Sequence, residues 1–241
     1  MARERVPANP PPKRNPRYQA LEDIVWVQSK GNAPPYDSLF NERQYSPEAV
    51  LYKAQYFAIE GMLLQSFEFV APGSRNAATY SVKFASMIKD ACNVFEIVCR
   101  DIYRKFYDVP EDAHLNILNF LSLERFLDLS KIRLVLVSTL DRFPDHPEIV
   151  APFTRLAQLP PEGDCSKAVP EWWNAYNRIK HSNDGFPEFA TLATAIASLS
   201  GLFCVLNRVY GTGFVYGMAS LPDLTLGFLP NARSSLLFSP E

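Results

Sequence analysis

The stretch with the most reactive side chains is WWNAYNRIKHSNDG, residues 172–185. Besides two tryptophans and a tyrosine, it holds the amide of Asn177, the guanidinium of Arg178, the ammonium of Lys180 and the imidazole of His181. An imidazole gains and loses a proton near neutral pH, and cationic groups form strong hydrogen bonds to phosphate. These residue types therefore favour proton transfer beside a bound phosphate group.

A short helix over residues 170–181 is predicted to carry these groups, because proline suits the first helical turn and glycine suits the residues after the last turn. On such a helix Asn177 and His181 lie one turn apart. Trp173 and Lys180 are predicted to share their side of the helix. The basic groups also lie at the C-terminal end, where the helix dipole favours cations.

A second interpretation of the same stretch stays open. In it the two tryptophans anchor the core, while Lys180 and His181 satisfy carbonyl groups left without partners at the helix C-terminus. Residue types alone favour this structural role. The gathering of an amide, an ammonium and an imidazole favours a phosphate site.

Glu96 interrupts the apolar run ACNVFEIVC, residues 91–99. If its side chain points inward, a cation must offset the cost of removing the carboxylate from water. Lys180 or Arg178 is the natural partner. The equal alternative is that Glu96 faces solvent.

Two long helices are predicted to precede the short one. Ser46, Pro47 and Glu48 supply an N-cap, a first-turn proline and an acid that complements the helix dipole, which predicts a helix over residues 47–69. Apolar residues then recur every three or four positions, which predicts a second helix over residues 79–107.

Residues 108–168 are less regular and are predicted to form an insertion. Within it, residues 117–130 are typical of a short helix and residues 131–137 of a strand. Another short extended element is predicted at residues 23–28 in the proline-rich tail 1–45. The C-terminal tail 211–241 is expected to fold back as extended segments.

A fourth helix is predicted from Pro187 to about residue 210, because apolar residues repeat three and four apart. A stripe of small residues runs beside the apolar one, so this helix is expected to be buried on two sides. The first two helices would cover one side, and a neighbouring element or a second subunit would cover the other. The stripe consists of Ala190, Ala193, Ala197, Gly201 and Cys204.

Composition indicates a single globular core with additional peripheral segments. The chain has 241 residues, of which 47% are hydrophobic and 21% charged, enough to bury a substantial core. The net charge of −2 conceals a basic arm, because residues 1–17 carry five Lys/Arg and one acidic residue. Such an arm contacts an anionic surface or is disordered.

Location and cofactors follow from the remaining composition. The N-terminus lacks the apolar segment of a signal peptide, and residues 189–206 contain too many Thr, Ser and Gly for a convincing membrane span, so we expect a cytoplasmic protein with no membrane contact. The spacing of the four cysteines suits neither zinc nor a disulfide framework. We therefore expect buried thiols and no metal or other cofactor.

The order of elements resembles that of the HEPN superfamily of helical domains over residues 46–210. Two long helices are followed by an insertion, a short helix with YNRIKH, residues 176–181, and a long helix rich in small residues. The resemblance implies a mainly α, four-helix bundle that works as a homodimer and juxtaposes two copies of its motif. Many such proteins are metal-independent ribonucleases or nucleotide-binding modules of bacterial defence and toxin–antitoxin systems.

The ribonuclease motif of that family is an Arg-Asn pair, three residues and a His. Here Asn177 and His181 match, while Tyr176 stands at the position of the Arg. The resemblance implies that His181 acts as general base or acid when a ribose 2′-hydroxyl attacks the adjacent phosphate, with Lys180 or Arg178 stabilising the developing charge. The predicted substrate-binding residues are Asn177, Tyr176, Trp173 and Glu96.

Two functions remain open at this point. The first is an RNA-directed protein, either a metal-independent endoribonuclease or a relative that binds RNA or nucleotides. The second is a non-catalytic helical module for dimerisation or for binding a partner protein, which Tyr176 at the arginine position favours. The sequence contains no GxxxxGK[ST] phosphate loop, no GxSxG elbow and no HExxH motif, which argues against P-loop NTPases, α/β-hydrolases and zincins.

Overall fold

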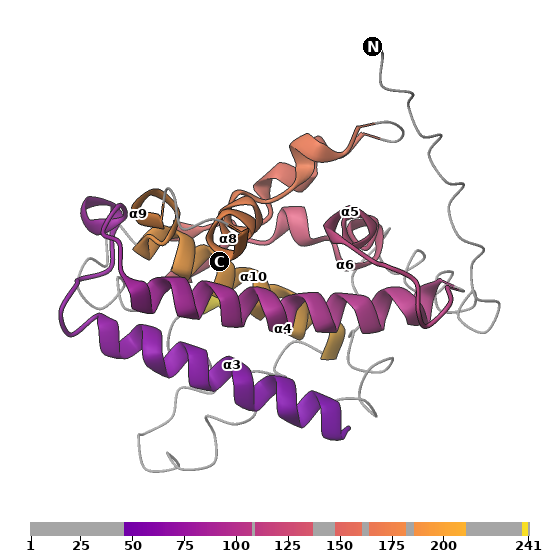
Figure 1. The fold of residues 1–241 in the computed structure, drawn as a ribbon, viewed down its shortest axis with the longest axis horizontal. Helices are drawn as coiled ribbons and strands as arrows, with labels where there is room; N and C mark the ends of the chain where they lie inside the picture. Colours follow the sequence, from indigo (N-terminus) through magenta and orange to yellow (C-terminus); the bar gives the residue numbers. More distant parts are fainter. Residues whose placement is uncertain are drawn as a thin grey trace.

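The computed structural model describes residues 46–107, 109–136, 148–160, 164–181, 186–210 and 238–240 (Figure 1). These residues are mainly helical, as predicted. The helices are α3 (Pro47–Ser66), α4 (Val82–Phe106), α5 (Ile117–Leu121), α6 (Glu124–Leu127), α8 (Glu171–His181), α9 (Phe186–Phe189) and α10 (Leu192–Tyr210). Short 3-10 helices are η1 (Ser74–Asn76), η2 (Leu129–Lys131), η3 (Thr154–Gln158) and η4 (Ser166–Ala168).

The two long N-terminal helices form where the sequence predicts them. The Ser46 side chain caps α3 by accepting a hydrogen bond from the Ala49 N–H (3.1 Å). Helix α4 begins at Val82, a little later than predicted, because the Ser81 side chain accepts a hydrogen bond from the Lys83 N–H (3.1 Å) and so caps it. Figure 1 shows α3 and α4 lying side by side as a hairpin.

A small antiparallel sheet follows the short helices α5 and α6. Its strands are β1 (Leu134–Leu136), β2 (Ile149–Val150) and β3 (Phe238–Pro240), in the order β2-β1-β3. The predicted β element of the insertion is thus present, and three C-terminal residues join it. The predicted element at residues 23–28 lies outside the described residues.

The predicted fourth helix is interrupted, which corrects the prediction of one continuous helix from Pro187. It begins as α9, stops at Ala190 and resumes as α10. Thr191 adopts a bridge to Tyr80 at the interruption, and its hydroxyl accepts a hydrogen bond from the Thr194 N–H (3.2 Å). A backbone held in extended conformation by that bridge cannot continue the helix.

Helix α10 is the central element of the core. It packs on α3, α4 and α8, and most of its side chains are buried. Among the described residues it is also a helix long and apolar enough to cross a membrane, with 19 residues and a mean hydropathy of 1.6. Because 78% of that span is buried within the protein, its apolar character is accounted for by packing.

The small-residue stripe of α10 has two different surroundings. At Gly201, a Cβ atom would lie 2.7 Å from Cζ2 of Trp172, so the indole ring of α8 lies directly against the α10 backbone. The second side of α10 is therefore covered at this point by an element of the same chain. Further towards the N-terminus, Ala193 is exposed and Ala197 is half-buried.

The cysteines behave as small apolar residues, as predicted. Cys92, Cys99 and Cys204 are buried free thiols, and Cys165 is half-buried. Burial raises the pKa of each of the three buried thiols well above its usual range. They are consequently poor nucleophiles in the folded protein.

Candidate functional site

The aromatic residues of α8 belong to the core. Trp172 and Trp173 expose only 3% and 4% of their surface. Both rings pack on Phe95 of α4, with centroid distances of 5.1 and 5.6 Å, and the Trp172 indole N–H donates a hydrogen bond to the Pro152 carbonyl (2.9 Å). The core-anchor interpretation therefore describes both tryptophans, and Trp173 is not exposed to a ligand.

Tyr176 and Lys180 lie together on the side of α8 that faces α4. Tyr176 is buried, and the Lys180 ammonium lies 5.4 Å from the centroid of its ring, a distance typical of a cation–π contact. Burial raises the pKa of the Tyr176 hydroxyl, and a hydrogen bond with Lys180 partly lowers it. Lys180 thus supports a core residue, although its side chain is exposed.

Glu96 does not pair with Lys180 or Arg178 as the sequence suggested. Its carboxylate forms an ion pair with Arg100, one turn further along α4, at 2.6 Å. The side chain is partly exposed, with 22% of its surface accessible. Because solvent reaches the carboxylate, no cation from α8 is needed to offset its burial.

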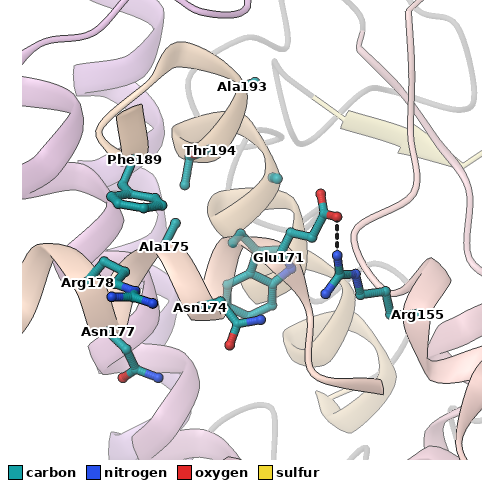
Figure 2. Close-up of a pocket in the computed structure, with 11 residues that line it drawn as sticks. Arg155, Glu171, Asn174, Ala175, Asn177, Arg178, Phe189, Ala193 and Thr194 are labelled. Atoms are coloured by element: carbon teal, nitrogen blue, oxygen red, sulfur yellow. Dashed lines mark hydrogen bonds and ion pairs between the residues drawn. The ribbon is translucent and has the colours of Figure 1, made fainter. Parts of the chain in front are cut away.

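A cavity of about 640 Å³ lies on the opposite side of α8, between α8, α9 and α10 (Figure 2). The helix contributes a polar wall to it. Glu171, Asn174 and Arg178 are spaced three and four residues apart and so form one stripe, and Asn177 lies beside them. Two of the predicted site residues, Asn177 and Arg178, therefore line this cavity.

The two charged residues of the polar wall differ in their partners. Glu171 forms an ion pair with Arg155 of η3, drawn as a dashed line in Figure 2. Arg178 is exposed and has no ion pair among the residues that the structure describes. Its guanidinium is therefore the cation that this cavity offers to an anionic ligand.

The opposite wall is mainly apolar, with the Thr194 side chain as its polar member. Phe189 of α9 and the methyl groups of Ala193 and Ala197 on α10 form its apolar part, and the Phe189 ring is half-buried (Figure 2). The first N–H groups of α10 are already satisfied, since Leu192 donates to the Thr79 carbonyl (2.8 Å) and Ala193 donates to Ala77 (3.0 Å). An anion in this cavity would accordingly be held by side chains of α8.

His181 is the last residue of α8 and is exposed. It lies one turn beyond Asn177, at the end of the polar side of the helix, but does not itself line the cavity. The predicted set is thus divided: Asn177, Arg178 and His181 lie on the outer side of α8, whereas Trp173 and Tyr176 face the core.

Six lining residues were not predicted from the sequence: Arg155, Glu171, Asn174, Ala175, Phe189 and Thr194. Glu171 and Asn174 carried a signal, because they share a helical stripe with Arg178. Arg155 and Phe189 carried none, since they come from other segments and approach only in the folded chain. Within the described ranges, no group of three or more His, Cys, Asp or Glu side chains is placed to hold a metal ion.

Comparisons with protein-family models, with curated proteins and with solved structures found no match to this chain.

Proposed function

We propose that this chain is an RNA-directed, HEPN-like protein and that the cavity between α8 and α10 binds one nucleotide unit of RNA. The observation that carries the proposal is that Arg178, which has no ion pair among the described residues, and the aromatic ring of Phe189 line facing walls of one cavity. A guanidinium matches the geometry of a phosphate. An aromatic side chain provides a stacking surface for an unpaired base.

The remaining walls suit the same ligand. The amides of Asn174 and Asn177 present donors and acceptors to base edges or a ribose. The volume of about 640 Å³ lies within the usual range for small-molecule sites, about 300–1,000 Å³. Ion pairing of Arg155 with Glu171 leaves a moderate positive charge at this surface.

His181 gives the proposal its candidate chemistry. Its imidazole would accept the proton of a ribose 2′-hydroxyl as that oxygen attacks the adjacent phosphorus, and the 5′-oxygen would leave. Arg178 would stabilise the charge that develops on the phosphate oxygens. Lys180, which faces α4, has no part in this arrangement. The protein would cleave RNA without a metal, as a metal-independent endoribonuclease.

The proposal extends to a homodimer in which two copies of α8 contribute to one RNA-binding surface. Its support is the resemblance described above and the exposure of the outer side of α8. Light scattering at micromolar protein concentration measures the mass directly. A monomeric mass would disprove the homodimer, and the cavity of one chain would then be the whole binding site.

RNA binding and cleavage in the presence of a chelator test the function. Arg178→Ala is expected to weaken RNA binding about tenfold, the effect of losing one charged hydrogen-bonding group. His181→Ala is expected to retain binding and lose cleavage. Lys180→Ala is the matched control, because it removes a cation from the same helix but outside the cavity, and it should bind and cleave as the parent protein does.

Three outcomes would contradict the proposal. These are RNA binding by Arg178→Ala equal to that of the parent protein, an equal loss in Lys180→Ala, or no RNA binding by the parent protein. Thermal unfolding of each variant establishes that the comparison is made between folded proteins.

One observation favours a second candidate function, a protein-interaction module. A groove of about 390 Å³ lies at the end of the α3–α4 hairpin, and large apolar side chains that line it are exposed: Phe69 (87%), Tyr80 (57%) and Met62 (36%). Clustered apolar exposure of this kind marks binding surfaces. If a second copy of the chain covers this groove, Phe69→Ser will convert a dimer to a monomer in light scattering.

A further inference from the structure

A second cavity, of about 280 Å³, adjoins the first across helix α10. Both cavities are lined by Ala193 and Ala197, which lie one turn apart on α10. Each of these residues presents only a methyl group, and Ala193 is exposed. The ridge between the two cavities is therefore low, and among the described residues only these two alanines line both cavities.

The second cavity differs from the first in its chemistry. Its walls are mainly apolar and include Ile149 and Val150 of β2 and Ile196 of α10. The described residues that line it include no Lys, Arg or His, and the charged residue among them is Glu148, whose carboxylate accepts a hydrogen bond from the Ser74 N–H (2.8 Å). Because the walls are mainly apolar and offer no cation among the described residues, the group that fits here is uncharged and largely apolar.

The ridge itself is held in a fixed position. Backbone hydrogen bonds join Leu192 to Thr79 (2.8 Å) and Ala193 to Ala77 (3.0 Å), which anchor the start of α10 to the segment before α4. Ile196, on the next turn, is buried, with 8% of its surface exposed. Both cavities are thus built on one rigid element, as a preformed site requires.

We infer that the two cavities form one trough for two successive unpaired nucleotides of an RNA strand. One base stacks beside Phe189 with its phosphate at Arg178, the strand crosses α10 over Ala193 and Ala197, and the next base enters the cavity beside Ile149. This inference rests on the proposed function, because it takes the occupant of the first cavity to be a nucleotide. It adds a second base subsite on the other side of α10.

The inference predicts a particular dependence of affinity on ligand length. Burying about 60 Å² of the apolar face of a base against an aliphatic wall improves affinity about tenfold. The dinucleotide pApA should accordingly bind about tenfold more tightly than AMP to the parent protein. Longer oligoadenylates should gain much less per added nucleotide, because both cavities are then filled. Competition against a fluorescently labelled RNA, followed by anisotropy, measures each affinity.

Ile149 offers the decisive variant, since half of its surface is exposed and it lines only the second cavity. Ile149→Glu places a second carboxylate there and should reduce the ratio of pApA to AMP affinity to about one. Ile149→Val keeps the wall apolar and should preserve most of the ratio. Ala193→Leu places a longer side chain between the two cavities and should also reduce the ratio of pApA to AMP affinity. It provides the test if Ile149→Glu fails to fold.

The possible outcomes distinguish failure of the trough from failure of the proposed function. If AMP binds in an Arg178-dependent manner but pApA binds no more tightly, the trough is disproved and the proposed function stands. The same conclusion follows if Ile149→Glu and Ala193→Leu both keep the full ratio. If neither AMP nor RNA binds to the parent protein, both the trough and the proposed function are overturned.

Discussion

The two sides of helix α8 have different roles: one packs in the core, and the other lines a cavity. The side facing the core holds Trp172, Trp173 and Tyr176, each of which exposes less than 5% of its surface. The outer side holds Asn174 and Arg178, which are exposed and line the cavity, while the buried Trp172 also forms part of the cavity lining. A dense run of aromatic and basic residues in a sequence therefore need not form one site, because a helix distributes neighbours over opposite faces.

Substitutions on either side of α8 test whether the two sides have these different roles. Substitutions on the core side should change the free energy of unfolding, whereas substitutions on the outer side should change ligand binding and leave stability nearly constant.

The largest effect is expected from Trp172→Ala. The indole is buried, packs edge-on against Phe95 and Phe153, and donates a hydrogen bond to Pro152. Removing a buried aromatic ring lowers the free energy of unfolding by about 3–5 kcal/mol, which urea denaturation measures. A loss below about 1 kcal/mol, in the range of surface substitutions, would show that the ring is not a core anchor.

Alkaline pH should destabilise the fold next most strongly. Burial raises the pKa of the Cys92, Cys99 and Cys204 thiols in the folded state, so the unfolded chain loses these protons first. Stability is unaffected below the ordinary thiol pKa of about 8.5 and falls above it, by up to about 1.4 kcal/mol per thiol for each pH unit.

Urea denaturation of the parent protein between pH 7 and pH 9 checks the alkaline prediction. The variant in which all three buried cysteines are replaced by alanine should show a flatter decline, relative to its own stability at pH 7. An equal slope for both proteins would contradict the assignment to the thiols.

Gly201→Ala should lower the free energy of unfolding somewhat less than Trp172→Ala does. The added Cβ would lie 2.7 Å from the Trp172 ring, and overpacking of a core costs about 1–3 kcal/mol. Gly61→Ala in α3 is the matched control, because nothing lies within 4 Å of its Cβ position. That substitution should stabilise the protein by about 0.4–1 kcal/mol. Similar thermal unfolding of the two variants would argue against the close contact of α8 with α10.

The smallest change in stability is expected on the outer side. Arg178→Ala removes an exposed side chain with no ion pair among the described residues, so its free energy of unfolding should stay within about 0.5 kcal/mol of the parent value. Its RNA affinity is the quantity that should fall. A large loss of stability would instead make Arg178 a structural residue.

Local signals in the sequence were sufficient to predict the long helices. The cap formed by Ser46 and the apolar spacing along α4 act within a few residues, and the structure confirms both helices. The interruption between α9 and α10 was not predictable in this way. It depends on a backbone bridge from Thr191 to Tyr80, more than a hundred positions earlier in the chain.

The candidate site was predictable only in part for the same reason. Spacing places Asn177 and His181 one turn apart, but the orientation of α8 relative to its neighbours decides which of its basic residues lines a cavity. That orientation brings Arg178 to the cavity, whereas Lys180 lies over the Tyr176 ring. Arg155 and Phe189 complete the cavity from outside the helix, and no pattern along the chain connects them with it.

The joint between residues 79–81 and 190–192 has a consequence for any regulation of this protein. Thr79 and Tyr80 line the apolar groove of the α3–α4 hairpin, and the backbone hydrogen bond from Leu192 to Thr79 attaches the groove to the start of α10. Ala193, one residue later, lines the cavity between α8 and α10. A displacement of the main chain at Thr79 would therefore be transmitted to the start of α10 through these hydrogen bonds, so the groove and the cavity between α8 and α10 are coupled through the backbone.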